Sequence, residues 1–419
     1  MQNAADGWDD RMSDKLHETN RPTKRWPSAE GGALTEAELN EAAALLAAGE
    51  TVAFPTETVY GLGADARSTE AVEQVFRAKG RPSDNPLIVH IAGMEQLRGL
   101  VRPLGEAERR LAERFWPGPL TLVLRAVPGA VSPRVTAGLD TVAVRMPDHE
   151  VALRLIRAAG CPVAAPSANR SGRPSPTAAQ HVQEDLGGRI AGIVDGGPTG
   201  VGLESTVVEC AGPDSVRILR PGGVTPEQLR AAGFKVLLEA DGAGGHADPA
   251  QAFEEGMGSS PGGASGEGAL ARDAAAKLAE APPTAPASAA AAPAAAPRSP
   301  GMKYAHYAPR GEMRLIAGDR ERVRAAVQAA ADEARGRGRR VGILAYEETA
   351  AAYRADIVLA CGSLAAPETA AQSLYAVLRE FDERGAEVIW AEGCPTDGIG
   401  LALMNRLSKA AGGRVEHID

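Results

Sequence analysis

The feature that most constrains the fold of this 419-residue chain is a low-complexity stretch at residues 240–299. It contains GMGSSPGGASGEG and PPTAPASAAAAPAAAPRSP, which offer almost no side chain that could fill a core. Proline interrupts helices, and Gly/Ser-rich sequence favours a flexible chain. Because such a long irregular stretch is uncommon inside a compact domain, it predicts a linker with at most a short helix at 268–281. The expected domains cover 31–239 and 300–419, after a disordered, polar tail at 1–30.

The first region alternates short apolar runs, rich in Val, Ile, Thr and Leu, with helical patterns. Strands are expected at residues 51–55, 87–91, 120–125, 141–145, 163–166, 190–195, 205–210 and 216–219. Helices are expected at 36–48, 69–78, 106–115, 150–159 and 177–186, with Thr69 and Thr177 as N-caps. This interleaving predicts an α/β or α+β domain built on a mixed sheet.

The region after the linker shows a more regular alternation. Strands are expected at 313–317, 340–345, 356–360 and 387–391, and helices at 320–337, 368–384 and 398–411. Regular β–α alternation predicts a small α/β domain with a parallel sheet.

Charge and cysteine content exclude several classes of protein. The net charge of −9 argues against a surface made mainly for wrapping nucleic acid. No apolar run approaches the roughly 20 residues of a membrane span, and the N-terminus lacks the apolar segment of a secretory signal. The four cysteines are Cys161, Cys210, Cys361 and Cys394. They are far apart and have no zinc-ligand spacing, so we expect reduced thiols in a cytoplasmic protein and no metal site.

The segment from residue 51 to residue 90 carries the strongest indication of a binding site. Lys79 and Arg81 bracket Gly80 just after a predicted helix, and Asn85 and Pro86 follow closely. An arginine fork and a lysine point charge on a rigid loop suit a phosphate chain. The same pair would also suit a solvated helix C-terminus, where cations are favoured by the helix dipole.

Other polar side chains stand where predicted strands end. Ser167 and Asn169 follow one strand, at the edge where open sheets bind ligands, although they would also suit an ordinary turn. Arg145 and Arg220 end apolar strands, where they could clamp a carboxylate or form salt bridges.

The chain has no P-loop, no complete dinucleotide fingerprint, no HExxH and no arrangement suited to nucleophilic catalysis. This inventory suits a reaction in which the protein binds anions and aligns reactants, as in phosphoryl or nucleotidyl transfer.

Seven ordered motifs resemble the threonylcarbamoyl-AMP synthases, the YrdC/Sua family. They are PTETVYGLGADA, KGRPSDNPLIVHI, WPGPLTLVL, TAGLDTVAVRMPDH, APSANRSGRPSPT, ESTVVE and ILRPGG. The resemblance is dense over residues 34–238. The block SPGMKYAHYAP and the region after it resemble the C-terminal domain of the two-domain members. The resemblance implies a YrdC-like twisted mixed sheet with a large positively charged cavity, followed by a Rossmann-like C-terminal domain.

The resemblance also implies a reaction. L-threonine, bicarbonate and ATP, with Mg²⁺, would give threonylcarbamoyl-AMP and pyrophosphate. A separate tRNA threonylcarbamoyl transferase complex would then modify adenosine 37 of tRNA.

Site residues follow from the family motifs position by position. Lys79, Arg81, Ser167 and Asn169 match the activity-determining and ATP-binding motifs. Further positions match the ATP side, namely Asn85, Thr141, Thr177, Arg220 and Tyr304. Positions on the threonine side are Thr56 or Thr58, His90, Arg145 and Ser205.

Some alternatives remain open on the sequence alone. Tyr304 and His306, at the end of the linker, would either form a lid over the cavity or anchor the second domain. A YrdC-like domain that serves carbamoyl transfer in hydrogenase maturation would need further modules, which the sequence does not show. The remaining alternative is a noncatalytic protein that binds double-stranded RNA through a basic cavity. The enzyme interpretation also leaves room for weak binding of RNA or tRNA.

Overall fold

The computed structural model describes residues 22–27, 32–82, 84–238 and 307–418. All of them belong to one compact unit, Met1–Leu238 together with Ala296–Asp419. The helix expected at 268–281, as well as Tyr304 and His306, lies outside the described residues.

The first domain is built on an 11-stranded mixed sheet in the order β1-β8-β2-β3-β7-β4-β6-β5-β9-β10-β11. Neighbours are parallel in some pairs, such as β4 with β6, and antiparallel in others, such as β5 with β6. The strands are β1 (Lys24–Trp26), β2 (Val52–Phe54), β3 (Gly61–Asp65), β4 (Ile88–His90), β5 (Leu120–Arg125), β6 (Thr141–Arg145), β7 (Val163–Ala164), β8 (Gly192–Val194), β9 (Thr206–Gly212), β10 (Ser215–Arg220) and β11 (Lys235–Leu238).

The helices of this domain agree with the sequence pattern to within two residues where one was expected. They are α2 (Glu36–Ala47), α3 (Thr69–Lys79), α4 (Glu106–Phe115), α6 (Glu150–Ala159) and α7 (Ala179–Leu186). Three short turns of helix were not expected: η1 (Met94–Leu97), α5 (Pro133–Thr136) and α8 (Pro226–Ala231).

Two predicted N-caps were wrong. Ser68 caps α3, since its side chain accepts a hydrogen bond from the Ala71 amide, and Thr69 is already helical. Helix α7 has Ala178 at its N-cap, without a side-chain cap, so Thr177 stands outside the helix.

The tail predicted to be disordered contains a strand. Residues Lys24–Trp26 pair in parallel with β8, and Trp26 is completely buried. The Trp26 indole donates a hydrogen bond to Glu41 at 3.0 Å. The buried Trp26 side chain explains why this strand forms, although the polar composition of residues 1–30 predicted no ordered structure.

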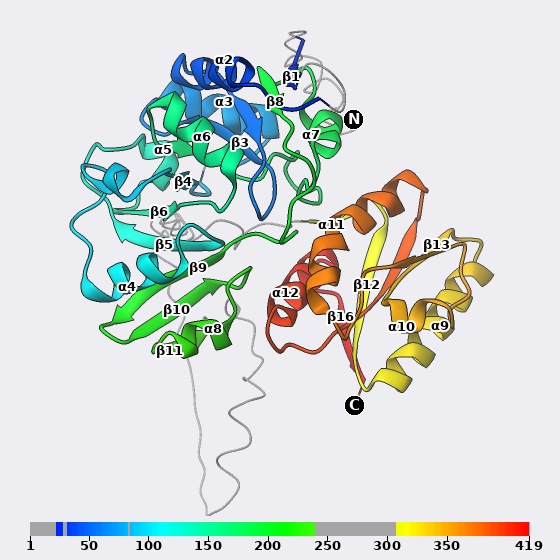
Figure 1. The fold of residues 1–419 in the computed structure, drawn as a ribbon. Coiled ribbons are helices and arrows are strands. Elements are labelled where there is room, and N and C mark those ends of the chain that lie inside the picture. Colours follow the sequence, from blue (N-terminus) through cyan, green and yellow to red (C-terminus); the bar gives the residue numbers. More distant parts are fainter. Residues whose placement is uncertain (1–21, 28–31, 83, 239–306, 419) are drawn as a thin grey trace, which may run out of the picture. The chain divides into compact units, whose positions relative to one another are not determined.

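The C-terminal domain contains a five-stranded, all-parallel sheet in the order β14-β13-β15-β12-β16. Its strands are β12 (Glu312–Gly318), β13 (Val341–Ala345), β14 (Ile357–Ala360), β15 (Val388–Glu392) and β16 (Val415–Ile418). Helices α11 (Pro367–Glu383) and α12 (Gly400–Ala410) cover one face, and α9 (Arg320–Gly336) covers the other (Figure 1). The short α10 (Glu347–Ala350) follows β13. The predicted parallel α/β domain is confirmed, with β16 as an additional edge strand.

Sheet register explains why distant polar residues meet. His90 and Arg145 end two neighbouring parallel strands and are direct register partners. The chain that leaves β7 then bridges back to β3, where Gly61 pairs with Ser167. Several loops therefore converge on one edge of the sheet. Among the described residues, no helix is long and apolar enough to cross a membrane.

Candidate functional site

A cavity lies where these strand ends converge, and its unfilled space, open solvent included, is about 740 Å³. Most of the residues predicted from the sequence line it. They are Thr56, Thr58, Lys79, Arg81, His90, Arg145, Ser167, Asn169, Ser205 and Arg220. The structure therefore gathers side chains from loops that are far apart in the sequence around one space.

One wall is formed by Arg145 and the turn that precedes β3. Arg145 is 3% exposed and donates from Nη1 to Thr58 Oγ1 at 2.9 Å and from Nε to the Gly118 carbonyl at 3.3 Å. Its Nη2 lies 2.5 Å from Glu57 Oε2, an ion pair that is not aligned as a hydrogen bond. Arg145 is thus held rigidly, with a carboxylate already beside it.

The two threonines of this turn differ in their remaining capacity for hydrogen bonds. Thr56 Oγ1 donates to the Val59 carbonyl at 2.7 Å and accepts from the amides of Thr58 and Val59. The two hydroxyl oxygens are 2.9 Å apart, and either can be the donor. Since a hydroxyl has one donor and two lone pairs, the contacts of Thr56 within the turn use its capacity, whereas Thr58, which also accepts from Arg145, keeps one site for a further hydrogen bond.

His90 lies beside this wall as a neutral group. Burial, and then the charge of Arg145, lower the pKa of His90 from 6.5 to about 3. Its Nδ1 has no hydrogen-bond partner among the described residues, and its ring packs edge-on against Phe54. A neutral imidazole can accept or donate a hydrogen bond without adding charge.

A second wall joins the segment around Lys79 to the segment around Asn169. Lys79 is 2% exposed, and its Nζ donates to the carbonyls of Ser167 and Asn169, both at 2.5 Å, and to Asn169 Oδ1 at 3.2 Å. Burial and the neighbouring Arg81 lower the pKa of Lys79, but three oxygen acceptors match the three donors of an ammonium. The charge of Lys79 therefore stands behind the 167–169 segment.

A third wall carries Ser205 and Arg220. Arg220 is buried, and its Nη2 donates to the Ser205 carbonyl at 2.9 Å and to Ser205 Oγ at 3.2 Å. Ser205 Oγ also lies 2.7 Å from Thr121 Oγ1, which fixes it against β5. Burial lowers the pKa of Arg220, although the nearby Tyr307 and Glu204 act in the other direction.

Three predicted residues do not line the cavity. Asn85 is completely buried, and neither polar atom of its amide has a hydrogen-bond partner among the described residues. Thr141 begins β6, four residues before Arg145, and pairs with Arg125. Thr177 accepts a hydrogen bond on its carbonyl from the Thr199 amide. Tyr304 lies outside the described residues.

The sequence reasoning missed Glu204 and Tyr307 as cavity residues, because their roles depend on the C-terminal domain. Glu204 accepts hydrogen bonds from Ser175 at 2.6 Å, from Tyr375 at 2.8 Å and from Arg406 at 2.8 Å. Despite burial, the charges of Arg406 and Arg220 and the hydrogen bonds from Ser175 and Arg406 lower the pKa of Glu204 to about 2. Tyr307 stacks on the Tyr375 ring with centroids 5.3 Å apart. The sequence signal for Glu204 was the motif ESTVVE, and for Tyr307 it was the block SPGMKYAHYAP, whose tyrosines and histidine were candidates for a lid.

The donor set of the cavity does not favour a protein-held Mg²⁺. This ion prefers carboxylate oxygens together with substrate phosphates. The carboxylate that lines the cavity, Glu204, already accepts hydrogen bonds from three side chains. Among the described residues, no group of three or more His, Cys, Asp or Glu side chains is placed to hold a metal ion.

Comparison with known proteins identifies relatives along nearly the whole chain. A family model described as "Telomere recombination" matches residues 44–222, and one described as "Threonylcarbamoyl-AMP synthase, C-terminal domain" matches residues 273–412. The threonylcarbamoyl-AMP synthase of Bacillus subtilis (strain 168) is 49% identical over 395 residues, which are 94% of this chain and 99% of the relative. The enzyme of the same name from Pyrococcus abyssi is 42% identical over 91% of this chain and 96% of its own length.

The fold has a solved counterpart as well. The crystal structure of P. abyssi Sua5 complexed with L-threonine has a TM-score of 0.75 and 39% identity, and covers 95% of this chain and 99% of that one. Identity at this level over almost the full length of both chains leaves one assignment. This chain is a member of the threonylcarbamoyl-AMP synthase family.

Proposed function

We propose that the cavity binds L-threonine and ATP side by side and that the chain converts them, with bicarbonate, to threonylcarbamoyl-AMP and pyrophosphate. The observation that carries this proposal is that Arg145, on one wall, and Lys79 and Arg81, on another, line the same cavity. Family membership agrees with it, since close relatives bear the name of this enzyme.

The chemistry needs alignment and exclusion of water more than it needs a strong acid or base. The amine of L-threonine combines with bicarbonate, water leaves, and a carbamate forms. A carbamate oxygen then attacks the α-phosphorus of ATP, and pyrophosphate leaves. Because a carbamate is unstable in water, a largely buried cavity protects it until transfer.

L-threonine is assigned to the wall of Arg145, Thr58, His90 and Ser205. The Arg145 guanidinium is preorganised by Thr58 and Gly118, and it would exchange its contact with Glu57 for the threonine carboxylate. Thr58 keeps a site for one further hydrogen bond to the amino acid, so Thr58 is preferred over Thr56 as the direct contact.

ATP is assigned to the wall of Lys79, Arg81, Ser167 and Asn169. Arg81 reaches the cavity as the direct phosphate contact, and Arg220 adds charge from the third wall. Lys79 would act from behind, since its ammonium is bonded to the 167–169 segment. Positive charge fixed in a buried site stabilises the charge that develops on the leaving pyrophosphate. Of the other residues predicted for the ATP side, Asn85, Thr141 and Thr177 do not line the cavity, so no contact with ATP is assigned to them, and Tyr304 stays a prediction.

Any Mg²⁺ would arrive with ATP and be held by its phosphate oxygens, where it would offset their charge. The product would pass to a tRNA threonylcarbamoyl transferase complex for the modification of adenosine 37. We place the reaction in the cytoplasm, in keeping with the four free cysteines.

The test is threonine-dependent release of pyrophosphate from ATP in the presence of bicarbonate. Arg81→Ala and Lys79→Ala should keep the fold but lose most turnover. Arg77→Ala, an exposed arginine one turn earlier on α3, is the matched control and should behave as the wild type. Full activity of the Arg81 variant would contradict the assigned phosphate site. Retention of double-stranded RNA without any pyrophosphate release would favour the noncatalytic alternative.

A further inference from the structure

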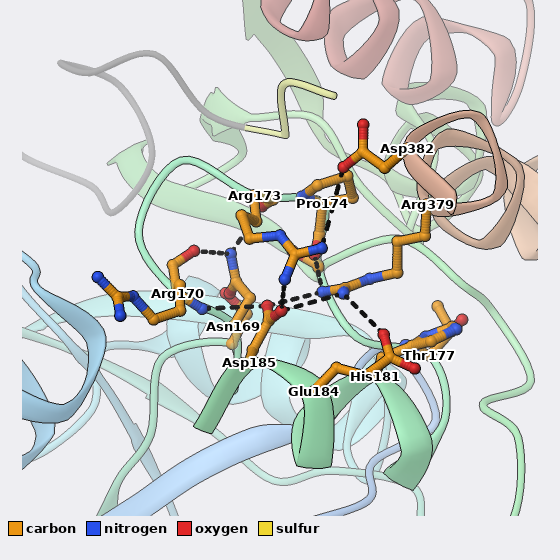
Figure 2. A network of polar contacts seen from close by, with 12 residues as sticks. Asn169, Arg170, Arg173, Pro174, Thr177, His181, Glu184, Asp185, Arg379 and Asp382 are labelled. Atoms are coloured by element: carbon orange, nitrogen blue, oxygen red, sulfur yellow. Dashed lines mark hydrogen bonds and ion pairs between the residues drawn. The ribbon is translucent and has the colours of Figure 1, made fainter. Parts of the chain in front are cut away.

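A buried arginine of the C-terminal domain reaches into the first domain. Arg379 belongs to α11, and its side chain is 1% exposed. Its Nη2 donates to Asp185 Oδ2 at 2.9 Å and to the Pro174 carbonyl at 2.5 Å, and its Nη1 donates to Asp185 Oδ1 at 3.2 Å. Figure 2 shows this guanidinium directed at the Asp185 carboxylate. All these partners lie outside the domain to which Arg379 belongs.

Asp185 in turn holds the loop that follows Asn169. Its side chain is fully buried at the end of α7. Its carboxylate accepts hydrogen bonds from the Arg170 amide at 3.1 Å and from the Arg173 guanidinium. One carboxylate therefore ties both ends of residues 170–173 to α7 and to Arg379 (Figure 2).

The same loop orients Asn169. The Asn169 amide donates to the Arg170 carbonyl at 3.0 Å and to the Arg173 carbonyl at 2.7 Å. Its Oδ1 accepts from Ser167 Oγ at 2.6 Å and from Lys79 Nζ at 3.2 Å. Both ends of the Asn169 amide are thus held in place: the loop holds the amide nitrogen, and Ser167 and Lys79 hold the amide oxygen.

We propose that Arg379 is a positioning residue for the nucleotide half of the cavity, acting through Asp185 on residues 169–173. The inference rests on the proposed function, which places ATP at this wall. Asn169, Ser171 and Gly172 line the cavity. Arg379 itself is absent from the lining and would touch neither substrate.

The physical reason is that the network is buried and charged. Asp185 is paired with both Arg173 and Arg379, so loss of either cation leaves its carboxylate with fewer partners in a site that water does not reach. The least costly response is for the Asp185–Arg173 pair to shift toward solvent, since the Arg173 side chain is already 26% exposed. That shift would move the two carbonyls that hold the Asn169 amide.

The wall assigned to L-threonine does not share these contacts. Arg145 is held by Thr58, Gly118 and Glu57, none of which bonds to Asp185. Loss of Arg379 should therefore lower the affinity for ATP selectively. A general loosening of the interface between the domains would instead lower the affinities for both substrates.

The experiment measures the affinities of α,β-methylene-ATP and of L-threonine, separately, for the full chain by titration calorimetry. The variants are Arg379→Gln and Asp185→Asn. Gln372→Ala is the matched control, since Gln372 lies on the same helix and donates to the Gly200 carbonyl at 2.6 Å without touching Asp185. Hydrogen exchange of the Arg170 amide, with and without the analogue, gives a second readout.

The expected result is a loss of analogue affinity of roughly tenfold or more in both variants, as for an unmade hydrogen bond to a charged group. Threonine affinity should stay within about twofold, and Asp185→Asn should speed exchange at Arg170. Equal losses for both ligands, or no loss for either, would overturn the positioning role. If Arg379→Gln does not fold, Asp185→Asn and the exchange data decide. A wild-type chain that binds no analogue would instead refute the nucleotide site itself.

Discussion

At the scale of single residues, the two threonines of the Arg145 wall should differ in the effects of their substitution. Thr58→Val removes the hydroxyl that keeps a site for a further hydrogen bond, so KM for L-threonine should rise roughly tenfold. Thr56→Val removes the hydroxyl that closes the local turn, and should lower the free energy of unfolding by about 1–3 kcal/mol. Steady-state kinetics and urea titrations of both variants check this. A Thr56 variant with normal stability and the weaker threonine affinity would reverse the assignment.

The sequence predicted which side chains gather around the cavity better than it predicted their contacts. Polar residues at the ends of apolar strands predicted the cavity, because register places such ends along one edge of the sheet. The sequence could not show that the Lys79 ammonium donates its hydrogen bonds to two backbone carbonyls. Such contacts depend on the three-dimensional course of the 167–169 segment and cannot be recognised from residue spacing.

His90 should make the protein sensitive to acid. Its pKa is lowered from 6.5 to about 3, so the folded state keeps it neutral where the unfolded chain binds a proton. The free energy of unfolding therefore falls as pH drops from 6.5 toward 3, and His90→Gln should reduce that slope by about 1 kcal/mol per pH unit. Urea midpoints between pH 6.5 and 4.5 measure the slope, and the exposed His417→Gln is the control. Identical slopes for wild type and His90→Gln would rule this account out.

At the scale of elements, long periodic segments were predictable and short ones were not. Helices α4 and α6 have the bounds that the apolar spacing indicates, because an amphipathic pattern over ten residues is hard to mistake. Strand β3 consists of GLGAD, whose glycines indicate a turn by local preference. Strand β1 has three residues, too few for any periodicity, and only its pairing with β8 defines it.

Strand β1 should matter to stability more than its length implies. Trp26 is completely buried against α2 and β8 and satisfies its indole N–H with Glu41. Trp26→Ala should lower the free energy of unfolding by about 3–5 kcal/mol, the cost of removing a large buried aromatic side chain. Lys24→Ala, which removes an exposed ion pair on the same strand, should cost no more than about 1 kcal/mol. Denaturant midpoints of the two variants give the comparison, and equal midpoints would mean that β1 is dispensable.

At the scale of the whole molecule, the contacts that link the C-terminal domain to the cavity were beyond sequence reasoning. Glu204 and Arg406 are 202 positions apart, and Asp185 and Arg379 are 194 apart. Each residue taken alone resembles an ordinary surface charge, and only the completed fold buries it beside its partner. The parallel sheet of the C-terminal domain was predictable from its β–α alternation, whereas its use as a source of buried partners for cavity residues was not.

The ion pair of Glu204 and Arg406 offers a test at this scale. Arg406→Met leaves Glu204 buried without its main cation, and should lower the free energy of unfolding by about 3–5 kcal/mol. Glu204→Gln combined with Arg406→Met removes both charges, so the double variant should be more stable than the Arg406 single variant, with Tyr375 and Ser175 still bonded to the amide. Urea titrations of the wild type, the two single variants and the double variant complete this double-mutant cycle. They are run above pH 6, where the carboxylate of Glu204, with a pKa of about 2, is charged. Strictly additive costs would mean that the two side chains do not interact, and that the C-terminal domain stabilises the cavity by packing alone.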